Sequence, residues 1–170
     1  MRPDGSASQR RPREPKPPVM RAPTDSAAGP PRRARYWVTM SRENAEIVRG
    51  VYARWAEGDF REGGVFDPLI VFVMGFGFPE SGIYFGTERV AEYMRGFLEP
   101  WERLTMRAEE IIPAGDSVVV AVRQDGVGRG SGAATGFDYF SVWSFRGRTV
   151  IRFETFRDRE DALDAVGLSR

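Results

Sequence analysis

Residues 137–156 read FDYFSVWSFRGRTVIRFETF, and this stretch shows how the chain folds. β-Branched and aromatic residues dominate two segments, 137–145 and 149–156, which predicts two β-strands. The short turn Arg146-Gly147-Arg148 between them requires the strands to run antiparallel. Successive side chains of a strand point to opposite faces. Phe137, Tyr139, Ser141 and Trp143 therefore share one face, and Asp138, Phe140, Val142 and Ser144 share the other.

Two further strands precede this pair, at residues 105–112 and 117–124, and a Gly115-Asp116 turn lies between them. The Gly-rich segment 126–132 has only the composition of a phosphate-binding loop, because it lacks the Gly-Lys-Ser/Thr ending. A hairpin connection or a bulge is the favoured reading. Short turns join most of these strands, which predicts a strongly curved antiparallel sheet.

The segment before this sheet predicts helices. Ser41 is a suitable N-cap, the apolar positions from Ile47 to Trp55 recur at helical spacing, and Gly58 ends the pattern. Residues 60–66 suggest a second short helix or a turn, and the continuous apolar run 69–74 suggests a strand buried on both faces. Gly82-Ile83-Tyr84-Phe85-Gly86 is expected to open a helix that Thr87 caps and that ends near Leu98. The inner face of that helix is expected to carry Val90, Ala91, Met94, Phe97 and Leu98.

Helices followed by a curved sheet define an α+β fold. The composition divides the chain into two parts. Residues 1–38 hold eight of the twelve prolines, and residues 1–36 hold nine Lys or Arg against three Asp or Glu. We predict that 1–38 is a disordered Pro/Arg-rich tail. One alternative is a basic arm that touches nucleic acid or an anionic partner. Another is that the true start of the protein is Met40.

The remainder of the chain carries sixteen Arg and twenty-one acidic residues, which does not favour nucleic acid as a partner of the folded domain. The chain contains no Cys and no His, which excludes thiolate and imidazole chemistry. Acid–base work would fall to Asp, Glu or Tyr. No apolar run is long enough for a membrane span and no secretory signal is evident, so we expect a cytoplasmic protein that does not enter a membrane. We also expect neither a metal nor a cofactor.

The order of these landmarks between Glu43 and Leu168 resembles the SnoaL-like branch of the nuclear transport factor 2 superfamily. That resemblance implies a SnoaL-like domain over residues 39–170. Its cone-shaped, curved antiparallel sheet wraps around N-terminal helices, as in nuclear transport factor 2-like and cystatin-like folds, and leaves an internal pocket. It also implies a homodimer through the outer sheet face, where Asp138, Phe140 and Val142 are expected.

The chain departs from the catalytic members of that superfamily. Alignment with ketosteroid isomerase places Ser141 at the oxyanion-side acid, Val73 at the base and Val51 at the tyrosine on the first helix. Steroid isomerisation needs a carboxylate base and a neutral donor pair, so we exclude that mechanism. Polyketide cyclases of the SnoaL type also resemble the isomerase in using a carboxylate. The strand 69–74 offers none.

We therefore predict an apolar internal pocket that binds a small hydrophobic molecule. The residues expected to line it come from the helices and from the inner faces of the strands: Tyr52, Trp55, Phe72, Met74, Tyr93, Phe97, Val120, Val122, Gln124, Trp143, Arg152 and Phe156. For Gln124 the alternative is a solvated strand end, and for the aromatic residues it is a purely structural role in the core.

A second hypothesis makes the domain an isomerase, dehydratase, hydrolase or cyclase acting on a hydrophobic carbonyl or ring compound. Glu154 would be the acid or base, helped by Tyr139 or Ser141. Desolvation would raise the pKa of Glu154, whereas Arg152 beside it would lower it. A structural Arg152–Glu154 pair is the alternative for both residues. A third hypothesis is a dimerisation or protein-interaction module.

Overall fold

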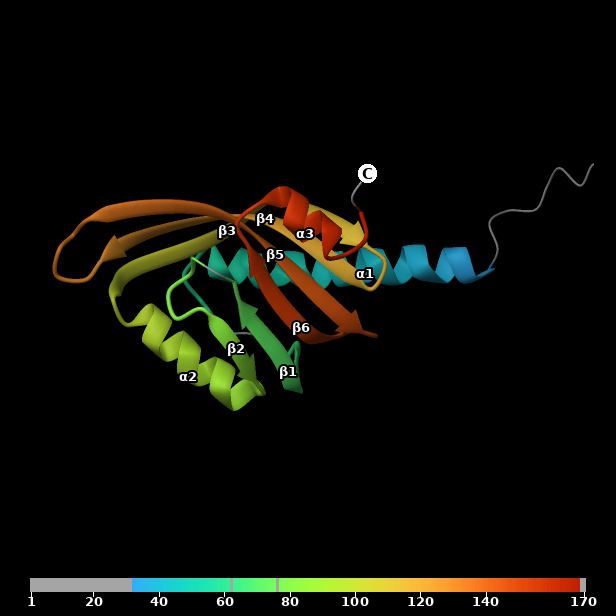
Figure 1. The fold of residues 1–170 in the computed structure, drawn as a ribbon, viewed down its shortest axis with the longest axis horizontal. Coiled ribbons are helices and arrows are strands. Elements are labelled where there is room, and N and C mark those ends of the chain that lie inside the picture. The colour runs from blue at the N-terminus through green and yellow to red at the C-terminus, as the bar shows by residue number, and fades with distance from the viewer. Residues whose placement is uncertain (1–31, 62, 76, 169–170) are drawn as a thin grey trace, which may run out of the picture.

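The computed structural model describes residues 32–61, 63–75 and 77–168, and residues 32–39 by their backbone only. Within these residues, three helices and six strands follow one another (Figure 1). In order they are α1 Arg32–Trp55, β1 Phe66–Met74, β2 Gly82–Phe85, α2 Thr87–Leu98, β3 Trp101–Ala114, β4 Ser117–Gly128, β5 Ala134–Arg146, β6 Thr149–Phe156 and α3 Arg159–Asp164.

The strands form one curved, open sheet in the order β2-β1-β6-β5-β4-β3. The predicted hairpins are confirmed: β3 with β4, β4 with β5, and β5 with β6 all pair antiparallel. The Gly-rich segment connects β4 to β5, with Val127 opposite Ala134. The pairing of β1 with β6 is parallel, so the sheet is not antiparallel throughout. The α+β architecture with a curved sheet around N-terminal helices is confirmed.

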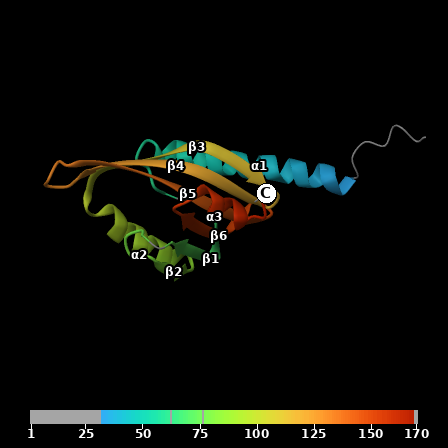
Figure 2. The ribbon, with the colours of Figure 1, turned by 45° about the horizontal axis from the view of Figure 1, so that its top comes forward.

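Packing on the concave face of the sheet buries the main core. The predicted stripe of α1 is confirmed, because Val48, Val51, Tyr52 and Trp55 are all buried. Register shifts in the pairs β1–β6, β3–β4 and β5–β6 mark bulges, which bend strands and increase their twist. The N-terminal end of α1 projects at one end of the molecule, and the hairpin of β4 and β5 projects at the opposite end (Figures 1 and 2).

The start of α1 differs from the prediction. The helix begins at Arg32, so Ser41 lies inside it and is not its N-cap. Residues 32–40 contain neither Gly nor Pro, so nothing in them stops a helix. Of the predicted tail, residues 1–31 lie outside the described residues and 32–38 belong to α1. The boundary at residue 39 therefore stays a prediction.

The segment 66–86 also differs from the prediction. β1 is not buried on both faces: Ile70, Phe72 and Met74 are buried, whereas Leu69 is 83% exposed. Residues 82–85 do not open a helix but form the edge strand β2, which pairs with β1. Thr87 is the first residue of α2, and the backbone of Gly86, with φ of 80°, occupies the N-cap position.

The convex face of the sheet has its own small core, covered by α3. Val119 and Val142 pack there against Ala162, and Phe140 and Phe156 lie beside them. In Figure 1, α3 lies on the side of the sheet away from α2. The short helix α3 therefore covers the face of the sheet opposite the main core.

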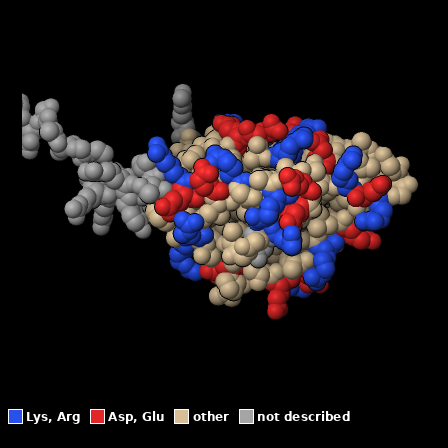
Figure 3. Space-filling model, turned by 180° about the vertical axis from the view of Figure 1, so that it is seen from behind, with Lys and Arg blue, Asp and Glu red and all other residues tan. Residues whose placement is uncertain are grey.

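Charged side chains of both signs are spread over the surface (Figure 3). On the face opposite to that of Figure 1, acidic and basic side chains are interspersed (Figure 3). Arg123, for example, lies 2.9 Å from Asp125 and 3.1 Å from Asp138. No helix in the described part of the chain has both the length and the apolar character that a membrane span requires.

Candidate ligand-binding site

An interior pocket lies between the concave face of the sheet, the end of α1 and α2. Its walls are aromatic and sulfur-containing, with Phe72 stacked on Phe153 at 4.6 Å between ring centroids. The cavity that remains is small, about 30 Å³, because these side chains fill the cone. The lining residues are Trp55, Phe72, Met74, Phe78, Tyr93, Met94, Phe97, Met106, Gln124, Tyr139, Phe153 and Thr155.

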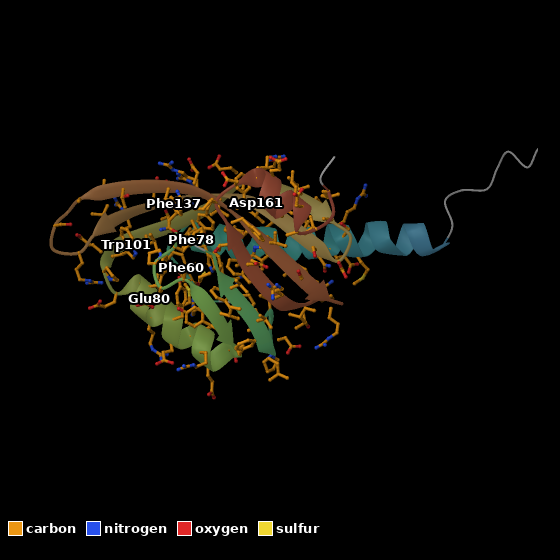
Figure 4. All side chains as sticks on the ribbon, viewed as in Figure 1. Phe60, Phe78, Glu80, Trp101, Phe137 and Asp161 are labelled. Carbon is orange, nitrogen blue, oxygen red and sulfur yellow. The ribbon has the colours of Figure 1, made fainter. Side chains whose placement is uncertain are left out.

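A larger pocket of about 410 Å³ adjoins the interior pocket, and we call it the mouth pocket. Phe78, Tyr93, Phe97 and Gln124 line both cavities, so the two share a wall. Figure 4 shows Phe78, Trp101 and Phe137 gathered between the sheet and α2, with Glu80 nearby. Phe78 meets the ring of Phe137 edge-on at 5.4 Å, and Trp101 completes the aromatic wall.

Few polar groups face these cavities. The side chain of Gln124 lines both pockets and has no hydrogen-bond partner among the described residues. The Tyr139 hydroxyl donates to the Met106 sulfur at 3.4 Å, and the Thr155 hydroxyl accepts a bond of 2.8 Å from the backbone N–H of Gly75. Gln124 is therefore the polar group best placed to meet a bound molecule.

The tyrosines of the pocket are neutral donors rather than bases. Burial raises the pKa of Tyr139 well above its ordinary value, and the nearby Tyr52 and Tyr93 add to the shift. Burial also raises the pKa of Tyr93, whose ring stacks on that of Phe97 at 5.9 Å. A phenol that stays protonated can donate a hydrogen bond but cannot remove a proton.

Ser141 lies in the core, not in the wall of the cavity. Its side-chain oxygen is 2.9 Å from the Tyr52 hydroxyl and accepts a bond of 3.0 Å from the Trp143 indole N–H. All three residues are buried, and none lines either pocket. Their expected place in the pocket is therefore wrong. Val120 and Val122 were also expected in the pocket wall, and they do not line it, because α1 packs directly over this part of the sheet.

The expected orientation of β6 is also wrong. Phe153 and Thr155 face the interior, whereas Arg152, Glu154 and Phe156 face the convex side. The pairing of β5 with β6 shifts by one residue between Ser144 and Phe145 of β5. A shift of one residue in β6 exchanges the side chains on its two faces. Glu154 accepts bonds from Arg152 of 2.7 and 3.1 Å, which confirms the structural alternative for this pair.

Of the predicted site residues, the structure brings seven into the pocket walls: Trp55, Phe72, Met74, Tyr93, Phe97, Gln124 and Tyr139. Phe72 and Met74, rather than Val73, are the inward positions of β1. Sequence reasoning missed Phe78, Met94, Met106, Phe153 and Thr155. Met94 was expected on the inner face of its helix but not in the pocket wall, and alternation from Gln124 through its cross-strand partner Met106 indicates another of them. Phe153 and Thr155 depend on the register shift of β6, and Phe78 on the loop after β1.

Comparison with known proteins places this geometry in a family. The model of the SnoaL-like domain matches residues 48–153, which is more than half of the chain. A search of the curated proteins finds no match.

Several solved structures share the fold. A nuclear transport factor 2-like protein from Burkholderia thailandensis E264 is 24% identical, with a TM-score of 0.60 over 74% of this chain and 95% of that one. A protein assigned as a SnoaL-like polyketide cyclase from Jannaschia sp. CCS1 is 19% identical, with a TM-score of 0.60 over 77% and 96%. TerC, co-crystallised with polyporic acid, is 21% identical, with a TM-score of 0.58 over 73% and 97%. The chain belongs to the SnoaL-like domain family.

Proposed function

We propose that the domain binds a small apolar molecule in the mouth pocket, with the inner end of that molecule directed at Gln124. The observation that carries this proposal is the mouth pocket itself. It has a volume of about 410 Å³ and is walled by Phe78, Tyr93, Phe97, Trp101 and Phe137. Small-molecule sites have volumes of roughly 300–1,000 Å³, mostly apolar walls and a few polar groups that fix orientation.

The interior pocket is suited to adapt to the inner end of the ligand. Its free volume of about 30 Å³ holds little more than one water molecule. However, Met74, Met94 and Met106 form part of its wall. Methionine side chains are unbranched and repack easily, so a deeper ligand needs side-chain movement only. The fold neighbour TerC, crystallised with polyporic acid, gives independent support for ligand binding in this fold.

The alternative of catalysis by Glu154 is not supported by the geometry. Glu154 and Tyr139 lie on opposite faces of the sheet, so the two cannot act on one substrate. Among the described residues, the groups of the interior pocket that titrate are Tyr93 and Tyr139, and burial keeps both protonated. The mouth pocket adds one carboxylate, Glu80, which is exposed and not enclosed with the ligand. We therefore favour binding over acid–base catalysis.

Native mass spectrometry of the full chain, followed by organic extraction, tests whether a discrete apolar molecule co-purifies. The substitution Thr135→Trp then tests its location, because Thr135 is exposed and lines the mouth pocket. A tryptophan there occupies the space of the ligand, so we expect the bound fraction to fall at least ten-fold.

Ala134→Trp is the matched control, because Ala134 is the exposed neighbour that does not line the mouth pocket. It should leave the bound fraction unchanged. Equal occupancy in the two variants would show that the ligand binds elsewhere.

Self-association is a second candidate function, favoured by exposed apolar residues on the outer face of β1 and β2. Leu69, Ile83 and Phe85 are 83%, 58% and 65% exposed. The expected dimer surface at Phe140 and Val142 is partly covered by α3 of the same chain. We therefore propose that two copies associate through the outer face of β1 and β2 instead. Light scattering at micromolar concentration should show a dimer that Phe85→Asp dissociates; a monomeric wild-type protein would exclude the idea.

A further inference from the structure

A second cavity lies on the other side of α2, and we call it the lateral pocket. It has a volume of about 680 Å³ and opens between the end of α1, the turn that follows it and α2. The aromatic rings of Trp55, Phe60 and Phe66 form one wall, and the aliphatic side chains of α2 form the other. Phe60 lies between the sheet and α2 in Figure 4.

The lateral pocket and the mouth pocket use different faces of α2. Tyr93, Gly96 and Phe97 line the mouth pocket, whereas Val90, Ala91, Met94 and Leu98 line the lateral pocket. At 100° per residue, these two sets occupy separate sectors of the helix surface. Trp55, Phe72 and Met94 line both the lateral pocket and the interior pocket, so these three side chains form a wall that the two cavities share.

One residue of this shared wall, Trp55, carries a buried hydrogen-bond donor without a partner among the described residues. Trp55 is only 5% exposed, and its indole N–H has no hydrogen-bond partner in the described part of the chain. A buried donor without a partner costs about 1–3 kcal/mol, so such groups are rare in native proteins and call for an explanation. An oxygen acceptor on a bound molecule would satisfy it.

The charges at the rim indicate an uncharged ligand. The guanidinium group of Arg61 forms an ion pair with the carboxylate of Asp59, with 2.7 Å between nitrogen and oxygen. Arg95 and Glu88 line the pocket without an ion-pair partner among the described residues, and their opposite signs favour neither anions nor cations.

We propose that the lateral pocket is a second small-molecule site, separate from the mouth pocket. Its ligand is a flat, uncharged apolar molecule that carries a carbonyl or ether oxygen. The space between an aromatic and an aliphatic wall selects a flat apolar body, and an acceptor that reaches the buried Trp55 indole N–H after a small shift of the ring gives that donor a partner.

Prodan, an uncharged naphthyl ketone whose emission moves to shorter wavelength in apolar sites, is a suitable probe. The titration is done with the full chain carrying Thr135→Trp, which closes the mouth pocket. Adding Ala91→Trp fills the lateral pocket from an exposed position of α2. Glu92→Trp is the control, because Glu92 is the exposed neighbour that lines neither pocket.

We expect Prodan to bind the Thr135→Trp protein with a blue-shifted emission, Ala91→Trp to weaken that binding at least ten-fold, and Glu92→Trp to leave it unchanged. Circular dichroism verifies that all three variants are folded. Equal binding by the Ala91→Trp and Glu92→Trp proteins, or no binding once Thr135 is replaced, would overturn the proposal. Because the mouth pocket is closed in every sample, failure here is distinct from failure of the proposed function.

Discussion

At the scale of single residues, the buried group of Tyr52, Ser141 and Trp143 shows how polar atoms are accommodated in an apolar core. The Ser141 oxygen lies within hydrogen-bond distance of both the Tyr52 hydroxyl and the Trp143 indole N–H. Polar atoms buried in this way are tolerated because each has a partner. The group lies behind the ligand cavity and fixes α1 against β5, so its role is positional.

This arrangement predicts that Ser141→Ala is more destabilising than Tyr52→Phe. Removing the serine oxygen takes the shared partner from both the Tyr52 hydroxyl and the Trp143 indole N–H and leaves these two groups only each other, at a cost of about 1–3 kcal/mol. Removing the tyrosine hydroxyl leaves Ser141 bonded to Trp143, at a cost of about 1 kcal/mol. Urea unfolding followed by circular dichroism measures both. A Tyr52→Phe protein as unstable as Ser141→Ala would contradict the shared-acceptor arrangement.

At the scale of elements, glycines show where the backbone lies close to its neighbours and where it does not. Gly50 is exposed on α1, and a Cβ atom there would have no neighbour within 4 Å. Gly75, at the end of β1, lies so close to β6 that a Cβ atom would be 2.4 Å from the carbonyl oxygen of Thr155. The same substitution should therefore have opposite effects at the two sites.

We predict that Gly50→Ala stabilises the protein by about 0.5–1 kcal/mol, because alanine loses less backbone entropy in a helix than glycine does. Gly75→Ala should destabilise it by about 1–3 kcal/mol, because β1 and β6 must separate to admit the methyl group. Thermal unfolding of the two variants beside the wild-type protein measures both signs. A neutral Gly75→Ala would mean that the β1–β6 contact is looser than the structure shows.

At the scale of the whole molecule, the closed packing of the cone controls how the tyrosines ionise. Burial raises the pKa of Tyr52, Tyr93 and Tyr139 above the ordinary value, which is about 10. The folded state thus holds these protons more tightly than the unfolded state. The stabilisation is fully present below pH ~10 and is lost as the pH rises above that value.

Alkaline titration should therefore unfold the protein cooperatively above pH ~10. Absorbance at 295 nm reports tyrosine ionisation, and far-UV circular dichroism reports the fold. We expect the last tyrosines to ionise together with the loss of the circular dichroism signal. Ionisation of every tyrosine with an unchanged signal would mean that the three phenols are accessible to solvent.

The hairpins, the first helix and the fold class of this protein could be predicted from the sequence alone. Alternation along 137–145, the turn at Arg146-Gly147-Arg148 and the apolar stripe of α1 predicted the hairpins, the helix and the α+β class, because these features follow from local periodicity and turn chemistry. The inward positions Trp55, Met94 and Phe97 followed from the same periodicity.

Only the tertiary structure decided which face of β6 is inside, that residues 82–85 pair as an edge strand, and that two cavities flank α2. A single register shift between β5 and β6 placed Glu154 outside and Phe153 inside. A bulge reverses every later side chain of a strand, yet it leaves no periodic signal in the sequence. The shape of a cavity likewise depends on segments far apart in the chain, so local patterns cannot specify it.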